Sequence, residues 1–133
     1  MVNRELYNQR LIENLHDGVF YVNSDCIIKY WNKAAEKITG ISSDEILESN
    51  CNDNIFKLKD AHNQLFVGSQ VPILKAMANG KAEENNAYFI RLDGRKIHLY
   101  MRANPVIEPG GKIIGGIQLF TDLTGKPQES RLR

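Results

Sequence analysis

The chain has 133 residues, the size of a single domain, and its 17 basic side chains nearly balance its 16 acidic ones. The basic residues are spread along the sequence instead of forming a stripe, which excludes a nucleic-acid-binding surface. Two cysteines, Cys26 and Cys51, do not make a disulfide framework or a metal site, and no apolar run reaches the roughly 18 residues of a membrane span. Polar residues follow Met1 where a signal peptide would be apolar, so we expect a cytoplasmic protein.

The first segment has apolar residues at helical spacing among polar neighbours. Tyr7, Leu11, Ile12 and Leu15 fall on one stripe, which predicts an amphipathic helix over residues 3–15. Such a helix needs an apolar surface to cover, and we expect it to lie on a face of the domain that follows.

Strands and short helices are predicted next. Residues 19–23 and 26–31 are β-branched and aromatic runs separated by a polar turn, which indicates a hairpin. Asn32 can cap a helix that Gly40 ends, and Ser42 with Glu45 forms a capping box for a second helix through Leu47.

Residues 49–70 are polar and irregular, with few apolar anchors. Pro72 fits the first turn of another helix, which Asn79-Gly80 should end.

The C-terminal half has the period of strands. Residues 87–92 and 97–104 flank Asp93-Gly94, a strong hairpin signal, and the second run alternates between an apolar and an amphipathic face. Pro105 and residues 109–111 are expected to form the next turn. Residues 112–122 are apolar on both faces, which predicts a central strand, and the glycines at 115 and 116 allow a backbone or a ligand to approach closely.

Together these elements predict an α+β fold. It has a five-stranded antiparallel sheet with short helices on one face, and the N-terminal amphipathic helix is free to cover the other.

The quoted runs resemble a known family. Residues 17–23 and 27–40, together with Gly116 to Thr124, resemble the two ends of a PAS sensor domain. More narrowly, residues 51–56, 71–73 and 115–122 are similar to PAS modules that precede diguanylate cyclase (GGDEF) domains in bacterial signalling proteins.

The residue patterns and the resemblance together predict an N-terminal helix at 1–16, a PAS domain at 17–124 and a linker at 125–133. The resemblance also implies a dimeric, non-catalytic input module for a C-terminal diguanylate cyclase or histidine kinase, with Asp122 and Thr124 relaying the signal.

A concave, mostly apolar space between sheet and helices is the expected ligand site. We expect it to be lined by Phe20, Val22, Phe56, Leu74, Met77, Phe89, Leu99, Met101, Ile114, Gln118 and Phe120. Gln118 is the polar residue that could recognise a small ligand. The alternatives are a filled core without any ligand, and a structural module that dimerises through the N-terminal helix and an outer sheet face carrying Tyr21, Ile113, Ile117 and Leu119.

The sequence gives little support for either flavin or haem as a cofactor. Cys51 resembles the adduct-forming cysteine of photoactive flavin-binding PAS domains, and Gln118 matches their glutamine, but Phe89 and Leu99 stand where those proteins have flavin-binding asparagines. We therefore expect a partly buried, unreactive Cys51. The helix carrying Leu74 has no histidine to ligate haem, and His16, His62 and His98 are expected at a helix end, in a loop and on a sheet surface.

An enzyme is not indicated, because no nucleophile, base and orienting carboxylate group together and no phosphate-binding glycine loop is present.

Overall fold

A computed structural model describes residues 16–51 and 57–124 of the chain. The expected N-terminal helix, the Phe56 position and the linker from residue 125 lie outside the described residues. Five strands form one antiparallel sheet: β1 (Gly18–Asn23), β2 (Ile28–Trp31), β3 (Glu83–Ile90), β4 (Lys96–Ile107) and β5 (Ile113–Asp122). Their spatial order is β2-β1-β5-β4-β3, which places β5 in the centre as its sequence predicts.

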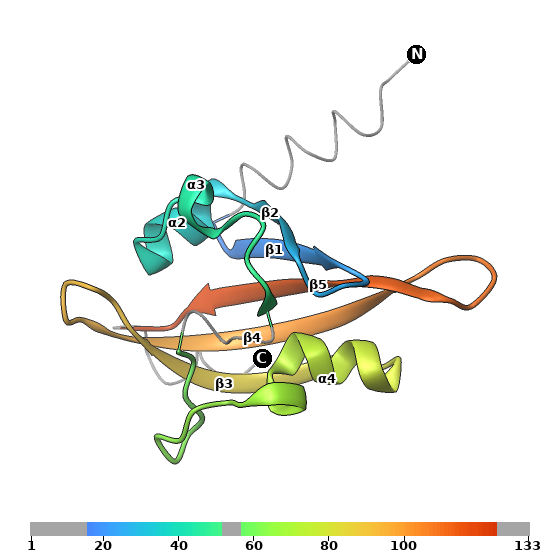
Figure 1. Ribbon diagram of the computed structural model, residues 1–133. Coiled ribbons are helices and arrows are strands. Elements are labelled where there is room, and N and C mark those ends of the chain that lie inside the picture. Colours follow the sequence, from blue (N-terminus) through green and yellow to red (C-terminus); the bar gives the residue numbers. More distant parts are fainter. Residues whose placement is uncertain (1–15, 52–56, 125–133) are drawn as a thin grey trace.

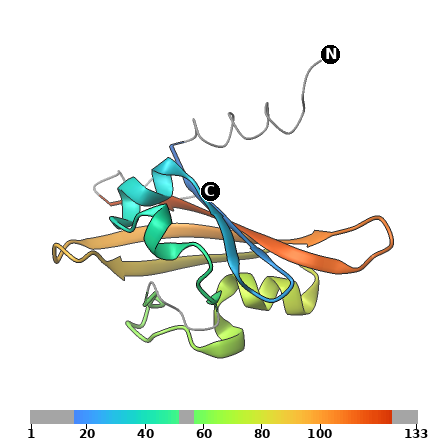
Figure 2. The same ribbon diagram turned by 45° about the horizontal axis from the view of Figure 1, so that its top comes forward.

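Short helices connect the strands and lie on one face of the sheet (Figure 1). Helices α2 (Lys33–Thr39) and α3 (Ser43–Ile46) lie over β1 and β2, whereas α4 (Pro72–Asn79), preceded by the 3-10 turn η2 (Gly68–Gln70), lies over β3, β4 and β5. The β4–β5 hairpin extends beyond the other strands, as the turned view also shows (Figure 2). The α+β architecture is therefore the expected one.

Local signals set the helix boundaries. The Asn32 side chain accepts the backbone N–H of Ala35, and Gly40 ends α2 in the left-handed conformation at φ 76°. Ser42 and Glu45 form the predicted capping box of α3. Pro72 is in the first turn of α4, and Gly80 ends that helix at φ 66°. These predictions are confirmed.

Strands β2 and β3 have boundaries that differ from the prediction. Residue Cys26 has a φ of 67° and lies in the turn after β1, so β2 begins only at Ile28. Strand β3 begins at Glu83 and ends at Ile90, because polar residues are tolerated on this edge strand and a turn from Arg91 to Arg95 follows.

The predicted turn at Pro105 is wrong, since β4 continues to Ile107. Strand β3 pairs with β4 only as far as Ala103, so Pro105 lies where β4 has a single strand neighbour, a position that tolerates proline.

The core lies between the sheet and the helices. Along β4, residues Ile97, Leu99, Met101 and Ala103 are buried, as the predicted alternation requires. On the opposite sheet face Tyr21 is exposed, and Ile117 and Leu119 are half-buried. Among the described residues, no helix is long and apolar enough to span a membrane.

Candidate functional site

Among the described residues, the interior expected to hold a ligand leaves very little free space. Between α2 and the sheet a space of about 10 Å³ remains, lined by Phe20, Trp31, Thr39, Leu58, Phe89, Leu99, Met101 and Phe120. A single water molecule needs about this volume and several polar partners. The Thr39 hydroxyl already donates to the Ala35 carbonyl at 2.7 Å and accepts from the Ile41 backbone N–H at 3.1 Å. The space therefore suits neither water nor a metabolite.

In the part of the interior that the structure describes, the rings of Phe20, Trp31 and Phe120 pack against one another. Phe20 lies 5.5 Å from Trp31 and 6.3 Å from Phe120 between ring centroids, and Trp31 lies 6.0 Å from Phe120, all in tilted arrangements. Contacts of this kind stabilise the core beyond simple burial of area. Trp31 and Thr39 were not expected here, because their place depends on how α2 closes over the sheet.

The other expected lining residues lie elsewhere. Leu74 and Met77 are on α4, which packs on Gly116 of β5: a Cβ at Gly116 would be 2.9 Å from Ile73 Cγ1 and 3.1 Å from Met77 Sδ. The absence of a side chain at Gly116 thus allows α4 to pack closely on β5 and does not leave a space for a ligand. Val22 is buried, but Ile114 is 42% exposed, so it is not an interior residue.

Gln118 faces the helices and is 1% exposed. Its neighbours on the adjoining strands are Phe20 and Ala103, and its Nε2 donates to the Leu119 carbonyl at 3.2 Å. The amide therefore has a partner within its own strand, which reduces the cost of burying it.

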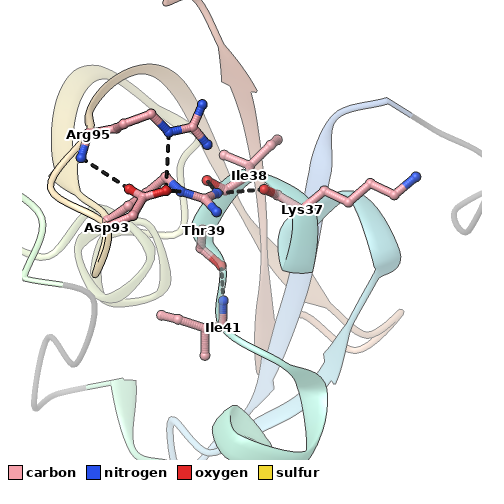
Figure 3. Close-up of polar contacts among 7 residues, drawn as sticks. Lys37, Ile38, Thr39, Ile41, Asp93 and Arg95 are labelled. Carbon is pink, nitrogen blue, oxygen red and sulfur yellow. Dashed lines mark hydrogen bonds and ion pairs between the residues drawn. The ribbon is translucent and has the colours of Figure 1, made fainter.

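A tether that the sequence did not reveal joins α2 to the β3–β4 turn (Figure 3). Arg91 Nη1 donates to the carbonyls of Lys37 and Ile38 at 2.7 Å each, and these are orphan carbonyls of the last helical turn. Asp93 accepts from Arg91 Nε at 3.3 Å and from the Arg95 backbone N–H at 3.1 Å. The cation thus lies at the negative end of α2.

The hydrogen bonds that Asp93 accepts also change the pKa of its carboxyl group. The Arg95 backbone N–H and, after it, the Arg91 side chain lower the pKa of Asp93 below its ordinary value. Arg91 and the helix carbonyls that it caps are more than fifty residues apart in the sequence, so no local motif predicts this cap. Only the position of Arg91 beside the Asp-Gly turn could have suggested it.

The expected relay residues form a clasp at the end of β5. Asp122 Oδ1 accepts the Thr124 backbone N–H at 2.8 Å, and Thr124 Oγ1 accepts the His98 backbone N–H at 2.8 Å. Leu123 between them is fully buried, and its N–H donates to the His98 carbonyl at 2.8 Å. The last described turn of the chain is therefore fixed to β4.

The two cysteines are neighbours across a short antiparallel bridge. The Cys51 N–H donates to the Cys26 carbonyl at 2.8 Å. Burial, and after it the nearby Cys26, raises the pKa of Cys51 to about 12, and burial also raises the pKa of Cys26. A thiol with so high a pKa is a poor nucleophile at neutral pH.

The histidines lie apart. His16 and His62 are exposed, and the His98 ring stacks on Tyr88 with 4.7 Å between centroids. Within residues 16–51 and 57–124, no three histidine, cysteine or acidic side chains cluster as metal ligands do.

Comparison with known proteins identifies the fold. The model of the PAS fold matches residues 6–123. The signal transduction histidine-protein kinase AtoS of Escherichia coli (strain K12) is 28% identical over 128 residues, a match that covers 93% of this chain and 19% of AtoS. The chain thus spans about a fifth of that relative.

Solved structures give the same fold. A PAS domain from Colwellia psychrerythraea has a TM-score of 0.69 at 13% identity, covering 92% of this chain and 98% of that one. An RNA-binding light-oxygen-voltage receptor has a TM-score of 0.72 at 23% identity, covering 90% and 33%. At these identities the likeness concerns the fold alone.

Proposed function

The chain belongs to the PAS family, and on this premise we propose that it is the non-catalytic input module of a bacterial signal-transduction protein. It is a PAS sensor module of the kind found in signalling proteins such as histidine kinases. The nature of the signal and the effector are the proposed parts.

We propose that this module works with a filled interior, through contacts with other protein segments. The observation that carries the proposal is the interior space of about 10 Å³, because small-molecule sites usually measure some 300 to 1,000 Å³. Of the two hypotheses drawn from the sequence, this observation favours the ligand-free module over an interior ligand. A ligand recognised by the Gln118 side chain would require the aromatic rings to move apart first.

The proposed effector is a C-terminal histidine kinase, with a diguanylate cyclase as the second candidate. The likeness to AtoS favours the kinase, and the clasp at Asp122 and Thr124 is a suitable exit because it ties the end of β5 to β4. A shift of β5 against β4 would change the direction in which the chain leaves the domain.

Replacing the matching segment of AtoS with this chain tests the proposal. We expect an active chimaera whose autophosphorylation changes with Thr124→Val, which removes the acceptor of the His98 N–H, and not with Ser24→Ala in the exposed turn after β1. A chimaera that is indifferent to both substitutions at equal stability would contradict the relay.

We also propose that the module is a homodimer, in a cytoplasmic setting. The proposal rests on the amphipathic pattern of residues 3–15 and on the exposed Tyr21 with the half-buried Ile117 and Leu119 of the outer sheet face. Leu11→Glu should shift the chain toward monomer in sedimentation. A wild-type monomer at high micromolar concentration would remove dimerisation from the account.

A further inference from the structure

A groove on the surface is much larger than the interior. It has a volume of about 480 Å³ and runs between the segment around α3 and strand β3, lined by Ile41, Glu45, Ile46, Ser49, Lys57, Lys59, Phe89, Ile90 and Leu92. This volume falls within the range of small-molecule sites. The groove is separate from the filled interior, although Phe89 lines both.

Apolar side chains are unusually exposed along this groove. Leu92 is 94% exposed in the β3–β4 turn, and Ile90 at the end of β3 is 48% exposed. Phe89 and Ile46 are buried and form the inner part of the lining. Covering Ile90 and Leu92 would remove apolar area from water, which favours an occupant with an apolar body.

The charges of the groove are mainly positive. Lys57 and Lys59 lie along it, and the structure shows no ion pair for either among the described residues. Glu45 is the carboxylate among the described residues of the lining, and its Oε1 accepts from the Ser42 hydroxyl at 3.0 Å within the capping box of α3. Among the described lining residues, two lysines without an ion pair and one carboxylate favour a single negative charge on the occupant.

We propose that this groove binds an amphipathic monoanion, namely a carboxylate with an apolar chain. The chain of the ligand lies against Ile90, Leu92 and Phe89, and its carboxylate lies between the ammonium groups of Lys57 and Lys59. The site differs from an interior PAS pocket because it needs no displacement of the aromatic core. It goes beyond the proposed function, since binding to the chain does not depend on any effector.

Titration of octanoate into the 133-residue chain, followed by amide NMR, tests the proposal. We expect saturable shifts at Ile41, Ser49 and residues 89–92, without shifts at Leu99 and Met101 in the interior. Octanol, which has the chain without the charge, and acetate, which has the charge without the chain, should each bind at least about tenfold more weakly, equivalent to roughly 1.4 kcal/mol.

Matched variants separate the groove from general attraction of anions. Lys57→Gln with Lys59→Gln should weaken octanoate binding about tenfold, whereas Lys112→Gln, an exposed lysine near the β4–β5 turn, should leave it unchanged. Leu92→Ser should weaken binding without unfolding the domain, because Leu92 contributes little to the core. Equal affinity in all lysine variants, equal binding of octanol, shifts confined to the interior or an absence of saturable shifts would each overturn the proposal.

Discussion

Helices α2 and α4 cover the same face of the sheet, but different contacts hold them there. Helix α4 packs its apolar side directly on Gly116, where the missing side chain leaves room for Ile73 and Met77. Helix α2 is fixed at its C-terminus by polar contacts, from Arg91 to two carbonyls and from Trp31 Nε1 to the Ile41 carbonyl at 2.9 Å.

The difference concerns how each helix could move. Shifting α4 requires repacking of a tight apolar contact, which is costly for a close-packed core. The end of α2 is held by directional bonds that are exposed or only partly buried, and water can replace these one at a time. We therefore expect the α2 end to be the more readily released part of the helical layer.

The largest effect on stability is expected at Gly116, where α4 packs on β5. Gly116→Val would place its side chain against Ile73 and Met77, so we expect a loss of about 3 kcal/mol in the free energy of unfolding. The matched control is Gly110→Val in the β4–β5 turn, where the nearest atom to a new Cβ is Glu108 Oε1 at 3.9 Å. Urea unfolding measures both, and equal losses would show that α4 does not depend on this close approach.

Removing the tether of α2 should cost less. Arg91→Ala leaves two helix carbonyls without the guanidinium, and we expect a loss of about 2 kcal/mol, of which Arg91→Lys should recover a part. Arg95→Ala, a mostly exposed side chain in the same turn, should change stability by less than about 0.5 kcal/mol. If Arg91→Ala and Arg95→Ala behave alike in urea unfolding, the tether does not hold α2.

A smaller effect is expected at Gln118 on the buried face of β5. With a filled interior, Gln118→Leu should alter the free energy of unfolding by less than about 1 kcal/mol, because the side chain keeps its approximate volume and loses one bond within its own strand. Melting curves of both variants with a metabolite panel provide the check. A wild-type ligand shift that disappears in Gln118→Leu would instead identify this residue as a ligand contact.

The smallest effect is a pH dependence at Asp93. Its pKa is lowered in the folded state, so its stabilisation is complete above the unfolded pKa of about 3.9 and is lost as the pH falls through the folded pKa. We expect Asp93→Asn to flatten the acid side of the stability curve and to leave the neutral side nearly parallel. Identical acid slopes in wild type and Asp93→Asn would separate Asp93 from the α2 tether.

Much of the fold could be predicted because its signals are local. Asn32, Gly40, the Ser42–Glu45 box and Pro72 act on backbone within a few residues, and the structure has each cap where the sequence predicts it. The alternation along β4 likewise identifies its buried face. Strand lengths were less predictable, since Pro105 is tolerated only because β3 ends before it.

The candidate site could be predicted only in part, for the same reason. Phe20, Phe89, Leu99, Met101 and Phe120 lie around the interior as expected, because strand parity directs them there. Trp31, Thr39 and Leu58 complete that interior through the way α2 and the segment before β3 fold over it. The volume that remains depends on all these side chains together, so no pattern along the chain could give it.

Native mass spectrometry of the purified chain tests the filled interior most directly. The account predicts protomer and dimer masses equal to those of the polypeptide alone, since a core with about 10 Å³ of space cannot retain a metabolite. A retained small molecule in stoichiometric amount, lost on unfolding and absent from Leu99→Trp, would contradict it and place a ligand between the helices and the sheet.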